Sequence, residues 1–197
     1  MKKLLLLGSA AMLFAVAPAI AQTSTTTPSR TSNGASSAER STDTRLIEHV
    51  ARGGMAEVKL GQLAEQKASS PEVKALAQRI VTDHSKANQQ LKQIAQREGV
   101  QPPTSIGKAQ AAKQQELEKL SGGAFDRAYV KDMIADHQKD IKYLQQQGAK
   151  VQDPTLKSFV QQTTPVLQQH LQMAEQASNQ LGTSGSSQPK SSTPRSR

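Results

Sequence analysis

The chain contains no cysteine, which rules out disulfide bonds, thiolate metal ligands, a cysteine nucleophile and a lipidated cysteine anchor. Aromatic side chains are also scarce, at 3% of 197 residues. Proteins bind single-stranded nucleic acids largely by stacking bases on such side chains, so we expect no nucleic-acid partner despite the formal net charge of +9. The sequence has no G-x-S-x-G, no glycine-rich phosphate loop and no H-E-x-x-H, so it predicts no reaction and favours a non-catalytic role.

Long apolar runs are missing as well, because no segment reaches the roughly 18 consecutive apolar residues that a transmembrane helix needs. The shorter apolar stretch near the N-terminus follows Lys2 and Lys3 and ends in the small-residue pattern Ala-Ile-Ala. Residues 1–21 are therefore predicted to be a cleavable signal peptide. We expect an exported, periplasmic protein, and the sequence gives no support for association with the outer membrane.

Composition divides the remainder into three parts. Residues 22–43 and 183–197 are rich in Ser, Thr, Gly and Pro and almost free of apolar side chains. Such segments bury too little surface to offset the entropy of ordering, so we predict a disordered linker and a disordered basic tail. Residues 44–182 have the size and apolar content of one folded domain.

Apolar residues in this domain recur at spacings of three and four, which is typical of amphipathic helices. The pattern predicts four long helices, which start near residues 44, 71, 123 and 154. A short helix is expected over 106–120. The predicted fold class is all-α: a ferritin-like four-helix bundle of two helical hairpins, joined by a crossover that contains the short helix.

One residue capable of binding a metal interrupts the apolar stripe of each long helix. These residues are Glu57, His84, His137 and His170. Each lies roughly 13 to 16 residues after its predicted helix start, a spread of about one helical turn. In a bundle of similar helices all four should meet near the middle, where one carboxylate and three imidazoles provide ligands for one Zn, Fe, Mn or Cu ion.

Further residues near these positions are candidates for additional ligands or for carboxylates that orient an imidazole: Asp140, Asp126, Met133 and Met173. The thioethers would suit copper, although methionine more often fills gaps in a core. Asp83 and Asp136 precede their histidines by one residue, about 100° around the helix, and are expected to border the stripe. His49 is expected at the surface.

The same pattern has a second interpretation. A buried Glu–His hydrogen-bond cluster without metal would place the same residue types on the same stripes. The domain would then be a non-catalytic structural or interaction module of the cell envelope. A bundle oxidase is a third alternative, disfavoured because the stripes contain so few carboxylates.

Three segments carry a resemblance to a known family. They are GGMAEVKLGQLAEQKASSPEVKALAQRIVTDHSKANQQL, GAFDRAYVKDMIADHQKD and DPTLKSFVQQTTPVLQQHLQMA. Together they resemble a family of exported bacterial domains of unknown function, often labelled predicted outer membrane proteins, over about residues 44–178. The resemblance implies a ferritin-like fold and no particular activity. Di-iron ferritins place Glu three residues before His, whereas Val81, Ile134 and Leu167 occupy those positions here.

Overall fold

Helices are the only regular elements in residues 33–184, the part of the chain that the computed structural model describes. They are α1 (Asn33–Lys67), α2 (Pro71–Arg97), α3 (Lys108–Glu118), α4 (Gly122–Gly148) and α5 (Pro154–Ser184). The predicted all-α class is confirmed. Within the described part, no helix combines the length and the apolar character that crossing a bilayer requires. The predicted signal peptide lies outside the described residues.

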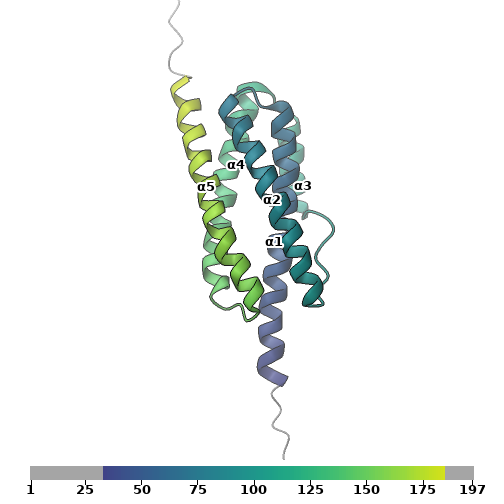
Figure 1. Cartoon of the computed structure of the whole chain (residues 1–197). Helices are drawn as coiled ribbons and strands as arrows, with labels where there is room; N and C mark the ends of the chain where they lie inside the picture. The colour runs from purple at the N-terminus through teal and green to yellow at the C-terminus, as the bar shows by residue number, and fades with distance from the viewer. Residues whose placement is uncertain (1–32, 185–197) are drawn as a thin grey trace, which may run out of the picture. The chain divides into compact units, whose positions relative to one another are not determined.

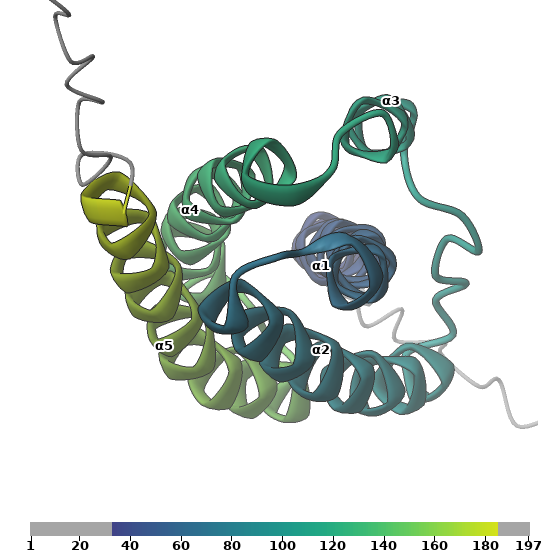
Figure 2. The same ribbon diagram turned by 90° about the horizontal axis from the view of Figure 1, so that it is seen from above.

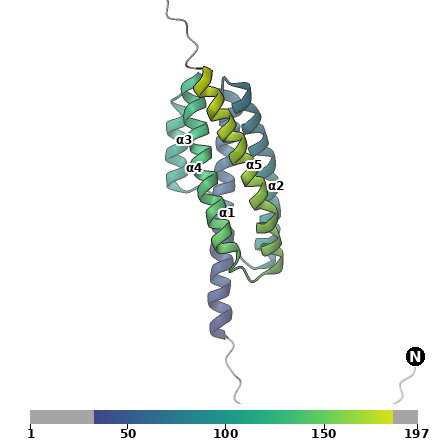
Figure 3. The same ribbon diagram turned by 90° about the vertical axis from the view of Figure 1, so that its left-hand side faces the viewer.

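The four long helices form two hairpins, α1–α2 and α4–α5 (Figure 1). Helix α2 packs against α5 and α1 against α4, which closes the bundle (Figure 2). The connection over residues 98–121 contains α3, which lies against α1 and α4 on the outside of the bundle (Figure 3). This crossover lets α2 and α4 run parallel, as expected for a ferritin-like bundle.

Local sequence signals set the ends of α2. Ser70 is its N-cap and accepts a hydrogen bond from the backbone N–H of Val73 at 3.4 Å, and Pro71 occupies the first turn, where a missing N–H costs nothing. Beyond the other end, Gly99 adopts φ = +66°, a left-handed conformation that glycine reaches without steric penalty. This residue lies at the start of the crossover.

Two buried carboxylates tie each hairpin to the turn of the other. Asp126 on α4 accepts the backbone N–H groups of Ser69 and Ser70, both at 3.0 Å, together with the Ser69 hydroxyl. Asp43 on α1 accepts the N–H of Asp153 at 2.9 Å in the α4–α5 turn. Because turn N–H groups lack partners within their own helices, these bonds fix the longitudinal position of one hairpin against the other.

Helix α1 extends further toward the N-terminus than the sequence predicted. Helix α1 begins at Asn33, not near residue 44, so residues 33–43 of the expected linker are helical. Composition indicates only what a segment can bury by itself. It gives no sign that Asp43 is buried against the turn of another hairpin, a contact that holds the helix in place there.

The hydrophobic core is divided into two clusters along the bundle axis. One surrounds Leu60, Ile80 and Met133, and the other surrounds Ala51, Leu91 and Ile141. Between them, every long helix contributes a buried polar side chain to a single layer. Its members are Glu57, His84, His137 and His170.

Asp126 offers a test of how the hairpins are joined. Asp126→Ala should lower the free energy of unfolding by about 3 kcal/mol, because it leaves the N–H groups of Ser69 and Ser70 without their charged acceptor. Urea unfolding of the metal-free protein measures the change, with Asp126→Asn as a variant that keeps one acceptor oxygen. A loss below about 0.5 kcal/mol, the range of ordinary surface substitutions, would contradict the proposed clamp.

Candidate metal centre

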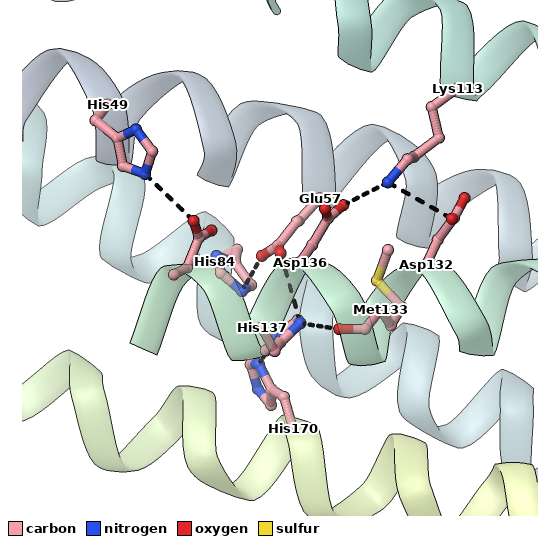
Figure 4. A network of polar contacts seen from close by, with 10 residues as sticks. His49, Glu57, His84, Lys113, Asp132, Met133, Asp136, His137 and His170 are labelled. Carbon is pink, nitrogen blue, oxygen red and sulfur yellow. Dashed lines mark hydrogen bonds and ion pairs between the residues drawn. The ribbon is translucent and has the colours of Figure 1, made fainter. Parts of the chain in front are cut away.

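The three histidines of the polar layer converge from α2, α4 and α5 (Figure 4). Each offers one ring nitrogen, and these three atoms lie within 4.8 Å of one another. His137 is 1% exposed and His170 0%. Burying imidazoles together is costly unless their polar atoms are satisfied, so the partners of each nitrogen decide what the cluster can do.

The outer nitrogens of His137 and His170 face oxygen acceptors. His137 Nδ1 lies 2.9 Å from the carbonyl oxygen of Met133, and His170 Nε2 lies 2.9 Å from Asp83 Oδ2. A carbonyl or an ionised carboxylate can only accept, so both of these ring nitrogens carry the proton and donate. In the neutral imidazoles, the remaining nitrogen of each ring is therefore a lone-pair acceptor.

These two remaining nitrogens point at each other. His137 Nε2 and His170 Nδ1 are 3.2 Å apart in a buried site. Two lone pairs at this distance repel, so the neutral pair leaves a buried contact unsatisfied. Either a proton, which would make a buried imidazolium, or a metal ion between the rings would relieve it.

Glu57 approaches from α1 on the other side. Its Oε2 lies 2.5 Å from His84 Nε2, and its Oε1 lies 3.6 Å from His137 Nδ1. The first contact is close but is not aligned as a hydrogen bond, and within the described chain neither Glu57 Oε2 nor His84 Nε2 has a hydrogen-bond partner. This close carboxylate–imidazole pair thus lies beside the two facing lone pairs of His137 and His170.

Burial and neighbouring charges shift the pKa values of the residues in the layer in different directions. Burial alone would raise the pKa of Glu57, but the charge of His84, with His137, outweighs burial and lowers that pKa to about 2. For His84, burial acts downward and Glu57 upward, and the carboxylate prevails to raise the pKa. Burial, with charge on His84 and His137, lowers the pKa of His170 to about 4 although Asp83 opposes the shift.

The spacing of the three histidine nitrogens fits one ion with small adjustments, whereas Glu57 does not belong to the group of atoms that lie this close together. Two imidazole nitrogens at Zn–N distances of 2.0–2.1 Å on a tetrahedral ion lie about 3.3 Å apart. The His137–His170 separation of 3.2 Å matches this value. The widest separation among the three histidines, 4.8 Å, must close by about 1.5 Å, a shift within reach of side-chain rotation.

Asp83 is a partner that sequence reasoning placed only at the border of the stripe. Its Oδ2 accepts the His170 N–H at 2.9 Å and also contacts Arg79 Nε at 2.6 Å. Metal-binding histidines commonly donate their other N–H to a carboxylate, which fixes tautomer and ring orientation. The sequence shows a carboxylate next to His84, which is the kind of residue that orients a histidine. Spacing along α2 alone could not show that Asp83 faces α5.

The additional candidates occupy different places. Asp140 Oδ1 is bonded to His49 Nε2 at 3.2 Å, and His49, expected at the surface, is only partly exposed and stacks on Tyr143. Asp126 lies about 16 Å along α4 from His137 at 1.5 Å per residue, and holds the α1–α2 turn as described above. It belongs to the frame of the bundle, contrary to the expectation of an additional ligand.

The methionines contribute in other ways. Met133 is fully buried in the core, and it contacts His137 through its backbone carbonyl oxygen. Met173 is partly buried against the same core cluster. Tyr129, which sequence reasoning did not single out, is buried, and its hydroxyl has no hydrogen-bond partner among residues 33–184; burial raises its pKa. No sequence pattern distinguishes it from an ordinary core aromatic.

A pocket of about 300 Å³ reaches the layer from the side of α1, α3 and α4. Its lining includes Glu57, His49 and Asp140. A much smaller cavity, about 20 Å³, lies between His49, Asp140 and His84. The Glu57 side of the layer is therefore accessible from a surface pocket, whereas His170 is buried.

Comparison with known proteins identifies the domain type. Residues 27–177 match the family described as "Domain of unknown function (DUF4142)". No curated protein matches the sequence.

Solved structures give the same fold. CopM in the Cu(II)-bound form matches with a TM-score of 0.61 and 19% identity, covering 70% of this chain and 96% of CopM. A DUF305 fragment from Deinococcus radiodurans gives 0.63 and 17%, covering 72% and 96%. A two-domain protein from Anabaena variabilis with DJ-1/ThiJ/PfpI-like and ferritin-like domains gives 0.59 and 18%, covering 80% of this chain and 42% of that one. At these identities the likeness shows the ferritin-like fold alone.

The metal-free domain should be most stable near pH 6.5. As the pH falls from 6.5 to about 4, the unfolded chain protonates His170 before the folded one does, so the free energy of unfolding falls. Protonation of Glu57 lowers the free energy of unfolding further as the pH falls from 4.5 toward 2. The contribution of His84 is complete below pH 6.5 and is lost as the pH rises through its raised folded pKa.

Urea unfolding in the presence of a chelator at several pH values measures this profile. Between pH 4 and 6.5 the slope due to His170 should approach about 1.4 kcal/mol per pH unit, and His170→Gln should remove it. Equal slopes for the wild type and His170→Gln in this window would show that His170 is not held neutral.

Proposed function

Because this chain belongs to the DUF4142 family of domains of unknown function, we propose its function from the site itself: it binds one transition-metal ion in the bundle core. The ligands are Glu57, His84, His137 and His170, and the role is metal handling or protection from stress at the bacterial envelope. One observation carries the proposal. His137 Nε2 and His170 Nδ1 face each other at 3.2 Å with their protons directed elsewhere.

The chemistry of the proposed ligands limits the choice of metal ion. Three imidazoles and one carboxylate favour Cu²⁺ or Zn²⁺ over Mn²⁺, which prefers oxygen ligands. Solved structures of CopM, a protein of the same fold, include a Cu(II)-bound form. This supports copper as the first ion to test. Iron in a di-iron arrangement is disfavoured because the layer has a single carboxylate, Glu57.

The competing function is a structural module of the envelope with a metal-free polar core. The contact between Glu57 and His84 favours it, since a buried carboxylate with a lowered pKa beside an imidazole with a raised pKa forms an ion pair whose charges balance without metal. This alternative leaves the His137–His170 contact to be satisfied by an extra proton.

The proposed function also requires that the protein is exported to the periplasm. With residues 1–21 acting as a cleaved signal peptide, the domain works in the periplasm. A protein without cysteine has no thiolate to offer copper or zinc there, and this layer would offer nitrogen and oxygen ligands instead.

Metal-dependent stability separates the two functions. Free Cu²⁺ or Zn²⁺ at 100 times the dissociation constant should raise the melting temperature of the untagged domain by roughly 5–10 °C, since binding adds about 2.7 kcal/mol. His84→Ala and His137→Ala should each abolish this shift. Bound metal is measured in parallel by elemental analysis, with about one ion per chain expected.

Ile94→Val provides the matched control, because it removes a buried methylene from α2 and no ligand atom. It should lower stability by about 1 kcal/mol and keep the full metal-dependent shift. If wild-type protein binds little metal and its melting temperature does not respond to either ion, the structural module is the correct function.

Asp83 should affect metal affinity without being a ligand. Asp83→Asn removes the carboxylate that orients His170, so the affinity for Cu²⁺ should fall by about 10- to 100-fold while the stoichiometry is unchanged. Competition with a chelator of known affinity measures the change. Asp132→Asn, which removes a carboxylate 3.6 Å from Lys113, is the control and should bind like the wild type.

A further inference from the structure

We propose that His49 and Asp140 form an entry site through which a divalent metal ion reaches the buried layer. This inference rests on the proposed function, because it concerns how the same centre is loaded. It assigns a role to the one histidine outside the layer and to the pocket of about 300 Å³ beside it. His49 Nε2 and Asp140 Oδ1 lie 3.2 Å apart, which is also a typical separation of two ligands on one ion.

The pair borders two spaces that also reach residues of the layer. His49 and Asp140 line both the open pocket and the cavity of about 20 Å³, which His84 also lines. A cavity needs only about 10–15 Å³ to hold a water molecule, so the smaller one can hold a species of that size. The pair therefore connects the surface pocket with the inner ligands.

The face of α1 provides a route between them. His49, Gly53 and Glu57 are spaced four residues apart, so they lie on one side of the helix. Gly53 places no side chain between the other two, and a Cβ there would lie 3.5 Å from Asp140 Oδ2. At the inner end, Glu57 is 4% exposed, lines the pocket and contacts His84 Nε2 through Oε2 at 2.5 Å.

Packing holds the entry site in place. The ring of His49, which Figure 4 shows, stacks on Tyr143, with ring centroids 3.8 Å apart and an interplanar angle of 29°. Both side chains remain partly exposed, at 32% for His49 and 25% for Asp140. A partly exposed pair can exchange its ion with water, which a fully buried site does slowly.

The chemistry of the pair selects the ion. One imidazole and one carboxylate suit a divalent first-row ion and lack the thioether or thiolate that Cu⁺ prefers. The lining also holds three basic side chains and three carboxylates in all, so its formal charges balance and the pocket as a whole does not attract cations. The basic residues are Arg52, Lys108 and Lys139, and the acidic ones are Glu57, Asp136 and Asp140. Capture of an incoming cation accordingly depends on Asp140 and His49 themselves.

Stopped-flow binding of Cu²⁺ to the metal-free domain tests the inference, with visible absorption of the bound ion as the signal. His49→Ala and Asp140→Asn should slow binding by about tenfold or more. Gly53→Leu, which removes no ligand, should slow it by obstructing the route along α1. In all three variants, release to a chelator should slow by the same factor as binding, because a route lowers the barrier in both directions and leaves equilibrium affinity unchanged.

Glu65→Gln is the control, since it removes one negative charge from an exposed position of α1 and should bind at the wild-type rate. Unchanged rates in His49→Ala and Asp140→Asn would overturn the entry site while leaving the buried centre intact. An equilibrium loss as large as that of His84→Ala would overturn it by making the pair ligands of the centre. Wild-type protein that retains no Cu²⁺ at equilibrium would reject the buried centre and its entry site together.

Discussion

The central constraint in this domain is the contact between His137 and His170. Both rings donate their outer protons, one to a backbone carbonyl and the other to Asp83, so their inner nitrogens face each other as lone pairs at 3.2 Å. An apolar pair of similar size would pack at this position without such conflict. A proton or a metal ion between the two imidazoles would remove the repulsion between their lone pairs. The negative charge of Glu57 would then balance the positive charge of that species.

The fold holds the rings in this relationship by fixing the hairpins against each other. Asp43 and Asp126 each accept backbone N–H groups from the turn of the opposite hairpin, one clamp at each end of the bundle. The two hydrophobic clusters then fill the space on either side of the layer. A shift of one hairpin by a single turn would replace the facing polar side chains with apolar ones, so the position of the layer depends on these clamps and cores together.

Helical periodicity predicted the fold class, the crossover and the four residues of the layer, because Glu57, His84, His137 and His170 interrupt apolar stripes at similar depths. The family resemblance is likewise confirmed. What sequence could not predict depends on contacts between helices. Asp83 reaches His170 across the α2–α5 interface, and Asp126 caps a turn distant in the chain. Periodicity specifies the face of a helix and does not specify which neighbour that face meets.

The protonation of the facing nitrogens is the most direct test of this account. Nitrogen-15 NMR of the metal-free domain at neutral pH distinguishes a ring nitrogen that carries a proton from one that bears a lone pair. The account predicts that His137 Nε2 and His170 Nδ1 both carry lone pairs, and that both signals shift when one equivalent of Zn²⁺ is added. A proton on either nitrogen, with signals that Zn²⁺ does not change, would contradict it and identify the layer as a metal-free hydrogen-bond cluster.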